Sequence, residues 1–360
     1  MPHIKNNKIS SILLQPFYVL LNMVSIKTDF CLKPFNTFRM AVRAERFCAV
    51  SRVADLAELY TKGEFHNKKV MILSQGSNVL FTNHIDHLVL HNEMWGKQLV
   101  AENDDFVMLK VNAGESWELL VDYVVQQGWG GIENLALIPG KVGASPIQNI
   151  GAYGAEVKDV ILEVEAFDLH SGEIRRFNNE ACHFGYRSSV FKTEFKDRFF
   201  ITSVVFKLAK NPVLNLSYQP LKLAFGDRKE VTLAEVRDEV VRIRKSKLPD
   251  PEVFPNAGSF FKNPVVTKEE ANLILASFPS APVYPQPDGM VKLAAGWLIE
   301  QCGYKGKRNG DVGVHPHQAL VLVNYGEATG QEVLQFAEQI IADVKLNFGI
   351  GLCPEVNIYP

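Results

Sequence analysis

The stretch Pro139–Gly154 combines glycines and polar side chains at a spacing that suits contact with a bound molecule. Glycines allow positive φ angles and leave no side chain between the backbone and a ligand. A flat, polar-edged ring system with a diphosphate tail needs both features. The alternative is a flexible surface loop, but the regularly spaced apolar residues here would gain nothing from exposure, so we interpret the stretch as a ligand-contacting loop. The glycines are Gly140, Gly143, Gly151 and Gly154, the polar residues Ser145, Gln148 and Asn149, and the apolar residues Val142, Ile147 and Ile150.

A second candidate is the turn Ser74–Asn78, which directly follows the apolar run Val70–Leu73. A strand that enters a tight turn of small residues can direct several backbone N–H groups into one concavity, which suits a phosphate. The spacing is neither that of a Walker A loop nor that of a dinucleotide G-x-G-x-x-G. Taken alone, an ordinary turn is the simpler interpretation.

Three single residues stand in segments that could act on a substrate. Ser259 follows small residues and precedes two aromatics, so its hydroxyl could lie in a partly dry pocket. Arg187 is flanked by Tyr186 and apolar residues, where its planar fork suits a carboxylate or a structural ion pair. Glu355 precedes a terminal strand. Taken alone, each has an ordinary structural explanation, and there is no G-x-S-x-G elbow or Ser/His/Asp order.

The histidines and cysteines do not predict a metal site. His315 and His317 have no carboxylate or cysteine partner at ligand spacing. The five cysteines are scattered and form no C-x-x-C pair. We therefore expect reduced thiols in a cytoplasm rather than disulfides or zinc.

The elements that must position these residues change in type along the chain. Up to about residue 228 the sequence predicts short strands and one helix, which Ser116 caps and which ends at Gly128. The clearest predicted strands are Val70–Leu73, Leu88–Leu90, Val107–Val111, Ile161–Phe167 and Phe200–Leu208.

After about residue 232 the sequence predicts an α+β part. Capping boxes at Thr232–Glu235, Thr267–Glu270 and Thr329–Glu332 begin three helices. A further helix ends at Gly303, and the buried strand Ala319–Val323 lies between the last two helices.

Composition sets broad limits. The chain has 360 residues, 47% hydrophobic and 22% charged, which is enough for two or three domains with cores. The net charge of −2 excludes a broad nucleic-acid surface but leaves a local anion site open. The apolar run Ile12–Val24 is too short and interrupted to span a bilayer, and no small-residue cleavage site follows it. We therefore expect no membrane segment.

Together these residues resemble one family, the UDP-N-acetylenolpyruvoylglucosamine reductases of bacterial peptidoglycan synthesis. The resemblance runs from Pro34–Phe38 to Pro354–Val356. Its most specific pieces are Pro139–Gly154, Asn256–Pro264 and Ala294–Gln301, which stand in the family's order.

The resemblance implies an α+β fold, with an FAD-binding domain of the vanillyl-alcohol-oxidase type made of two α/β subdomains, and a smaller α+β substrate-binding domain. We expect a disordered N-terminal extension over residues 1–28 and the FAD-binding domain over 29–228, rejoined by a C-terminal strand at 354–360. The substrate-binding domain would occupy residues 229–353. We expect a cytoplasmic monomer.

The resemblance also implies roles for individual residues, none of them a metal ligand. One departure concerns the turn Ser74–Asn78, which we call the phosphate turn. In the family it usually reads Gly-Gly-Gly-Ser-Asn, whereas Ser74 and Gln75 replace the first two glycines here. The implied catalytic residues are Arg187, Ser259 and Glu355. The implied substrate-binding residues are Tyr218, Lys247, Asn263 and Gln318, with Tyr218 in the tyrosine loop of the family's first subtype. The implied FAD-binding residues are Gly76, Ser77, Asn78, Gly143, Ser145, Pro146, Gln148, Asn149, Ile150, Gly151, Ala152 and Gly154.

The implied reaction is the NADPH-dependent, FAD-mediated reduction of the enolpyruvyl ether of UDP-N-acetylglucosamine enolpyruvate to UDP-N-acetylmuramate. In it Arg187 and a protonated Glu355 would stabilise an enolate, and Ser259 would protonate C2. One alternative is a flavin oxidase of the same fold that acts on an alcohol or sugar. Another is a non-catalytic nucleotide-sugar binding protein.

Overall fold

The computed structural model of the chain describes residues 24–360, and most of the predicted N-terminal extension, residues 1–23, lies outside them. The prediction was wrong for the last two residues of that extension. Lys27 and Thr28 begin strand β1 (Lys27–Cys31), which pairs antiparallel with β2 (Arg43–Val50). Backbone pairing in a sheet therefore orders this end of the chain.

The first sheet has the strand order β1-β2-β5-β3 and carries the phosphate turn at one edge. β5 (Ile85–Asn92) lies parallel to both β2 and β3 (Val70–Leu73), and α1 (Val53–Thr61) connects β2 to β3. Five of the last six residues of β5 are buried, as expected for a strand that is covered on both faces.

The second sheet has five strands, and every strand pair in it is antiparallel. Helix α2 (Trp117–Gln126) packs on it and begins at Ser116, whose hydroxyl accepts a hydrogen bond from the backbone N–H of Leu119. The strand order is β11 (Ile174–Asn178), β10 (Ile161–Asp168), β12 (Phe199–Ala209), β7 (Phe106–Asn112) and β6 (Lys97–Glu102).

Helices α3 (Gln219–Phe225) and α4 (Leu233–Lys247) follow the second sheet and complete its core. The buried face of α4 carries Val236, Val240 and Ile243, which belong to the same apolar cluster as α2 and the second sheet. The predicted boundary at residue 228 would separate α4 from this cluster. The packing argues instead for a boundary after α4.

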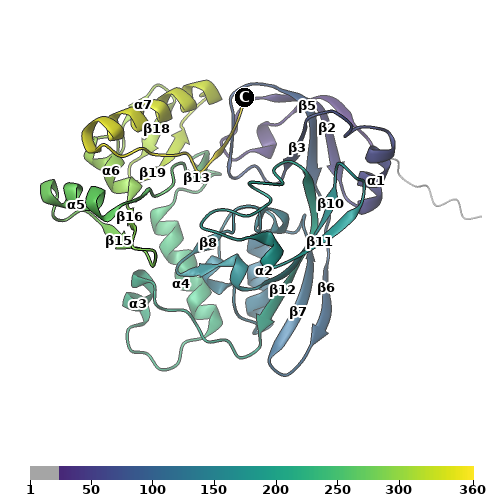
Figure 1. Cartoon of the computed structure of the whole chain (residues 1–360), viewed down its shortest axis with the longest axis horizontal. Helices are drawn as coiled ribbons and strands as arrows, with labels where there is room; N and C mark the ends of the chain where they lie inside the picture. Colours follow the sequence, from purple (N-terminus) through teal and green to yellow (C-terminus); the bar gives the residue numbers. More distant parts are fainter. Residues whose placement is uncertain (1–23) are drawn as a thin grey trace, which may run out of the picture.

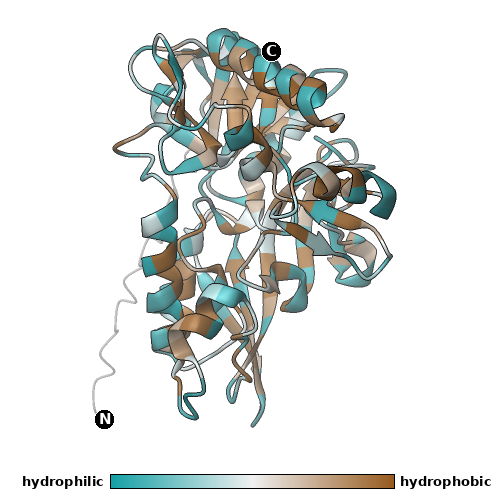
Figure 2. Cartoon of the chain, turned by 90° about the vertical axis from the view of Figure 1, so that its left-hand side faces the viewer, coloured by the Kyte–Doolittle hydropathy of each residue, from teal (hydrophilic) through white to brown (hydrophobic). Residues whose placement is uncertain are grey.

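The remaining chain forms two small antiparallel sheets with three helices, on the left in Figure 1. Hydrophilic and hydrophobic residues alternate along α7, as Figure 2 shows, because one face of this helix packs on the sheet. One sheet contains β13 (Asn256–Ser259), β19 (Gln318–Asn324), β18 (Val312–His315) and β17 (Arg308–Asn309). The other sheet contains β14 (Val265–Val266), β16 (Val291–Leu293) and β15 (Val283–Pro285). The three helices are α5 (Lys268–Ser277), α6 (Ala295–Gln301) and α7 (Gly330–Phe348).

The C-terminus returns to the beginning of the chain. β20 (Asn357–Tyr359) pairs parallel with β4 (Val79–Phe81), directly after the phosphate turn. The first sheet, the loop between β1 and β2 and the C-terminal part also share one buried apolar cluster, which includes Phe38 of that loop and Phe260. Segments that are far apart in sequence are thereby fixed around one location.

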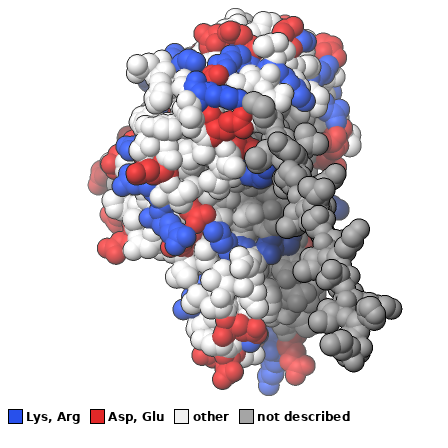
Figure 3. Space-filling view, turned by 90° about the vertical axis from the view of Figure 1, so that its right-hand side faces the viewer, with Lys and Arg blue, Asp and Glu red and all other residues white. Residues whose placement is uncertain are grey.

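Two observations concern possible contact with a membrane or with a strongly charged partner. Among residues 24–360 there is no helix with the length and apolar character needed to cross a membrane. On the face shown in Figure 3, cationic and anionic side chains are interspersed, without a large area of one sign.

Candidate functional site

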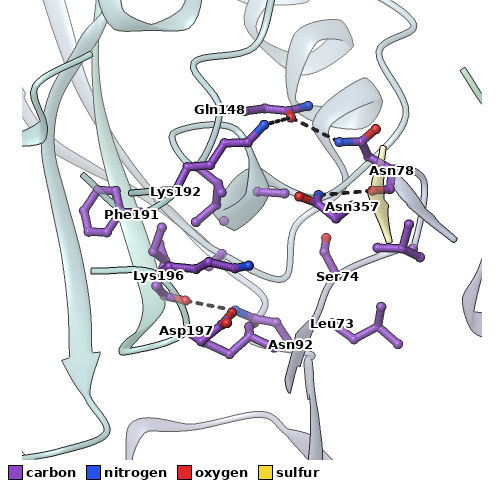
Figure 4. Close-up of a pocket in the computed structure, with 18 of the residues that line it drawn as sticks. Leu73, Ser74, Asn78, Asn92, Gln148, Phe191, Lys192, Lys196, Asp197 and Asn357 are labelled. Atoms are coloured by element: carbon purple, nitrogen blue, oxygen red, sulfur yellow. Dashed lines mark hydrogen bonds between the residues drawn. The ribbon is translucent and has the colours of Figure 1, made fainter. Parts of the chain in front are cut away.

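The phosphate turn and the glycine-rich stretch face each other across one cavity, at the edge of the first sheet and beside the second. Figure 4 shows polar side chains from both loops, from the segment before β12 and from β20 around this cavity. Of the predicted FAD-binding residues, the structure brings five to its wall, which are Gly76, Ser77, Asn78, Gly143 and Gln148.

The turn requires one glycine. Gly76 has a φ of 66°, and a Cβ atom there would come within 2.1 Å of the Phe35 carbonyl oxygen. Neither Ser74 nor Gln75 has a positive φ, so these two residues fit the turn without backbone strain. The departure from the usual sequence of this turn therefore leaves its conformation possible.

Hydrogen bonds join the turn to the other walls of the cavity. The Asn78 side-chain amide donates to Gln148 Oε1 at 3.1 Å and to the Glu355 carbonyl at 3.3 Å. The backbone N–H of Asn357 donates to the Asn78 carbonyl at 3.0 Å. Gln148 Oε1 also accepts a hydrogen bond from Lys192 Nζ at 3.1 Å. Asn78 thus connects the turn, the glycine-rich stretch and the C-terminal segment.

Behind the turn, the contact of the buried His91 with the half-buried Lys141 links β5 to the glycine-rich stretch. Lys141 Nζ lies 3.2 Å from His91 Nε2 and donates to the Asn92 carbonyl at 2.5 Å. His91 Nδ1 lies 3.1 Å from the Leu73 carbonyl, and because a carbonyl only accepts hydrogen bonds, Nδ1 carries a proton. Burial, together with the charge of Lys141, lowers the pKa of His91 to about 4.

Several cavity residues escaped the sequence analysis. Lys192 and Lys196 bring two cations into the cavity, and burial lowers the pKa of Lys192. Asp197 lies beside them with a φ of 60°, and burial raises the pKa of its carboxyl. Lys192 follows Arg187 in a segment that the sequence did single out, whereas nothing in the sequence marked Asp197.

One polar atom at the cavity has no partner. The hydroxyl oxygen of Ser74 is buried and forms no hydrogen bond with the residues that the structure describes. Burial of an unpaired hydroxyl costs about 1–3 kcal/mol. A ligand that accepts a hydrogen bond in this cavity would remove that cost.

The other predicted FAD-binding residues do not line this cavity. The buried Ser145 hydroxyl donates to the Val142 carbonyl at 2.7 Å. The buried Asn149 amide donates to the Glu156 carboxylate and to the Gly185 carbonyl, each at 3.1 Å. These two side chains hold the loop in shape, and their contact with a cofactor stays a prediction. The same applies to Pro146, Ile150, Gly151, Ala152 and Gly154.

The three predicted catalytic residues lie in segments that meet. Arg187 Nε donates to Glu355 Oε1 at 3.0 Å, and Arg187 Nη2 donates to the Gly151 carbonyl at 2.6 Å. The backbone N–H of Glu355 donates to the carbonyl of Phe260 at 2.7 Å, directly after Ser259. Glu355 therefore connects Arg187 to the strand that ends in Ser259, and its own carbonyl contacts Asn78.

An aromatic residue beside Arg187 was missed as a site residue. The Tyr186 ring has the Arg187 guanidinium at 5.5 Å on one side and Lys292 Nζ, from β16, at 5.1 Å. Burial raises the pKa of Tyr186. The two cations make this region suitable for an anionic group.

The predicted substrate-binding residues fall into separate groups. Asn263 Oδ1 accepts a hydrogen bond from the Ala295 N–H at 3.0 Å, and Gln318 lies close to Gly296, so both stand at the beginning of α6. The Tyr218 ring packs edge-on against Tyr153 at 5.3 Å. Lys247 is exposed at the end of α4 and has no ion pair or hydrogen bond among residues 24–360. Of the four predicted substrate-binding residues, the structure therefore places only Asn263 and Gln318 near each other.

No group of three or more His, Cys, Asp or Glu side chains within residues 24–360 is arranged to hold a metal ion. His315 Nδ1 accepts a hydrogen bond from the backbone N–H of His317 at 3.3 Å, which engages the one pair that the sequence suggested.

Comparison with known proteins identifies related sequences over both parts of the chain. Residues 44–178 match a family model described as an FAD binding domain, and residues 250–359 match the C-terminal domain of UDP-N-acetylenolpyruvoylglucosamine reductase. A protein of that name from Flavobacterium johnsoniae is 46% identical over 93% of this chain and 100% of its own length. Another from Chromobacterium violaceum is 48% identical over 92% of this chain and 98% of its own length.

A solved structure agrees with this. The crystal structure of UDP-N-acetylenolpyruvylglucosamine reductase from Thermus caldophilus covers 94% of this chain with a TM-score of 0.65, at 24% sequence identity. That likeness shows a common fold and confirms the predicted α+β class, and the family model confirms the predicted FAD-binding domain. From the sequence identity and coverage above, the chain belongs to the UDP-N-acetylenolpyruvoylglucosamine reductase family.

Proposed function

We propose that this protein reduces the enolpyruvyl ether of UDP-N-acetylglucosamine enolpyruvate to UDP-N-acetylmuramate, with NADPH as reductant and FAD as cofactor. The observation that carries the proposal is the contact of Arg187 with Glu355, beside the strand that ends in Ser259 and next to the cavity. Arg187, Glu355 and Ser259 come from three distant segments. An ion pair that only stabilised the fold would account for the contact of Arg187 with Glu355 but not for the serine beside it.

The cavity residues fit FAD. Gly76 allows the turn to pack against the backbone of Phe35, the Ser74 hydroxyl lacks a partner, and Lys192 with Lys196 offers positive charge for a diphosphate. The cavity wall also includes Asp197, from the segment before β12, and Asn357 of β20. Bound FAD supplies the hydride chemistry between NADPH and the enolpyruvyl group.

The role of Arg187 and Glu355 is to stabilise charge on the substrate. Hydride arrival at C3 of the enolpyruvyl group leaves negative charge at C2, delocalised into the substrate carboxylate. The Arg187 guanidinium can pair with that carboxylate, and its second contact, to the Gly151 carbonyl, keeps it oriented. Glu355 can donate a hydrogen bond to the same charge once it takes up a proton.

Ser259 is the proton donor to C2 in this proposal. Its hydroxyl makes no hydrogen bond among residues 24–360, so it is free to face a substrate. A serine hydroxyl is a weak acid, but an enolate carbon is strongly basic, and position matters more than acidity. General acid catalysis of this kind contributes about 10²–10⁴-fold to the rate.

We assign substrate binding to the predicted residues and to the neighbourhood of Tyr186. Asn263 and Gln318 at the beginning of α6 can hydrogen-bond the sugar nucleotide, and the exposed Lys247 and the half-buried Lys292 can attract its phosphates. Tyr218 can pack on the ligand from the opposite side. We further propose that the protein works in the cytoplasm, as its scattered free cysteines suggest, and that it is a monomer.

A coupled assay tests the activity. The purified protein should show flavin absorbance and should oxidise NADPH only when the enolpyruvyl sugar is added. The product should be heavier than the substrate by two hydrogens. NADPH oxidation that ignores the sugar would contradict the proposal.

The same assay separates the rival functions. A flavin oxidase of this fold would consume oxygen with an alcohol or sugar and would not respond to the enolpyruvyl ether. A nucleotide-sugar binding protein without catalysis would lack flavin absorbance. The contact of Arg187 with Glu355, beside the strand that ends in Ser259, favours the reductase over both.

A further inference from the structure

Ser74 is the first residue of the phosphate turn, and its side chain differs from those of Ser77 and Asn78 in its hydrogen bonding. Ser77 Oγ donates to the Pro139 carbonyl at 3.1 Å, and Asn78 Nδ2 contacts Gln148 and Glu355. The Ser74 hydroxyl oxygen is buried and has no partner among residues 24–360. In Figure 4 it lies between Leu73 and Asn78 at the edge of the cavity.

The backbone of the turn offers a second donor. The Gly76 carbonyl accepts a hydrogen bond from the Thr37 N–H at 3.2 Å. Because the peptide bond is trans, the N–H of Ser77 points in the opposite direction. Gly76 and Ser77 both line the cavity, so a hydroxyl donor and an amide donor are available from one turn.

The charges in the cavity specify an anion. Lys192 and Lys196 line it together with a single acidic residue, Asp197. Lys192 has Lys262, Arg187 and Lys196 as cationic neighbours and Glu355 as an anionic one. Phosphate oxygens accept hydrogen bonds and carry negative charge, so they match both the free donors and the excess of cations.

We propose that the Ser74 hydroxyl donates a hydrogen bond to a phosphate of the FAD diphosphate, as a ligand that a glycine at this position cannot provide. The proposal rests on the FAD site assigned above. The absence of a positive φ at Ser74 means that a side chain is accepted here without strain, so the hydroxyl adds a contact and does not disturb the turn.

The proposal predicts that Ser74→Ala does not destabilise the apoprotein but weakens FAD binding. Removal of a buried, unpaired hydroxyl leaves the apoprotein equally stable or more stable, so the Tm of the apoprotein should stay the same or rise. Loss of a hydrogen bond to a charged phosphate should weaken FAD binding, and we expect the Kd of FAD to rise about 10- to 100-fold.

The test measures flavin binding to apoprotein by quenching of flavin fluorescence, with FAD and with riboflavin, which lacks phosphate. Wild type, Ser74→Ala and Ser74→Gly are compared, and Gln75→Ala serves as the control because this neighbour is exposed. The Kd of FAD should rise for both Ser74 variants and not for the control. The Kd of riboflavin should be the same for all four proteins.

Each contrary result has a distinct meaning. If the Ser74 variants bind FAD as wild type does, this inference is wrong although the proposed function stands. If Ser74→Ala lowers the Tm of the apoprotein and weakens FAD and riboflavin alike, the hydroxyl is structural and the inference is also wrong. If wild-type apoprotein binds no FAD, the proposed function itself fails.

Discussion

Ser259, Arg187 and Glu355 divide the proposed chemistry between a proton donor and two groups that stabilise charge. Arg187 and Glu355 are already in contact at 3.0 Å, whereas Ser259 is linked to them only through the backbone of the adjacent Phe260. Substitution of the serine should therefore disturb the geometry of the pair little. This makes Ser259 the most selective probe of the reaction.

Ser259→Ala should separate the two half-reactions. Flavin reduction by NADPH needs no proton from Ser259 and should keep its rate within about twofold. Flavin reoxidation by the enolpyruvyl sugar should slow by about 10²–10⁴-fold, the usual size of general acid catalysis. Anaerobic stopped-flow absorbance measures both rates, and Ser280→Ala, an exposed serine in the same part of the chain, is the control. Equal slowing of both half-reactions would disprove the assigned role.

Single residues also show where sequence reasoning stops. Each catalytic candidate looked ordinary by itself, and only family resemblance joined them, because spacing along the chain does not report contacts between distant segments. Lys196 and Asp197 were missed for that reason, since the cavity that they line forms only when β12 and β20 are placed. The functional roles of all these residues remain predictions.

At the scale of elements, the phosphate turn depends on Gly76 for its conformation. Gly76→Ala introduces a Cβ atom within 2.1 Å of the Phe35 carbonyl oxygen in addition to the strain of a positive φ. We expect a drop in Tm and loss of most bound FAD. The control is Gly289→Ala, at a residue that also has a positive φ (81°) but no atom within 4 Å of the new Cβ, and this variant should cost only about 1–2 kcal/mol and keep FAD. Wild-type FAD content in Gly76→Ala would refute this account of the turn.

The contact of the buried His91 with the half-buried Lys141 gives the protein a pH dependence. The pKa of His91 is about 4 in the folded chain and 6.5 in the reference state, so the unfolded chain binds the proton first as pH falls. The contribution of neutral His91 to the free energy of unfolding has its full value above pH 6.5 and should decline by roughly 3 kcal/mol as pH falls toward 4. Urea unfolding of wild type and His91→Asn at several pH values measures this. An identical pH dependence in both proteins would rule His91 out.

Local patterns in the sequence were sufficient for several elements. The five strands predicted before residue 228 all occur, β3 with the predicted bounds, and the predicted strand Ala319–Val323 lies within β19. Helices α2, α4, α5 and α7 each begin at the predicted cap. Capping boxes and apolar periodicity are local signals, so they survive without knowledge of the fold. β1, β6 and β11 were not predicted, because these edge strands are largely exposed and lack an apolar pattern.

On the scale of the whole molecule, the C-terminal part and the first sheet share a core. The Phe38 and Phe260 rings pack edge-on with centroids 6.3 Å apart, and both side chains are fully buried. Sequence could not reveal this, since apolar periodicity shows that a face is buried but not which face covers it. The same limitation explains why the boundary at residue 228 cut α4 from the core that it completes.

The shared core predicts that the two parts lose structure together. Phe38→Ala should destabilise the protein by about 3–5 kcal/mol, because it leaves a cavity between them. Hydrogen exchange should then accelerate in β18 and β19 as well as in the first sheet. Leu223→Ala, at a side chain that is 77% exposed, should change stability by less than about 0.5 kcal/mol. Faster exchange confined to the first sheet would show that the parts are independent.

The central claim is that electrons pass from NADPH through FAD to the enolpyruvyl sugar, and one anaerobic titration tests it most directly. The holoprotein is bleached with one equivalent of NADPH in the absence of oxygen, and the enolpyruvyl sugar is then added. The account predicts that the flavin absorbance returns as UDP-N-acetylmuramate forms. A flavin that stays bleached with the sugar and recovers only when air is admitted would contradict it.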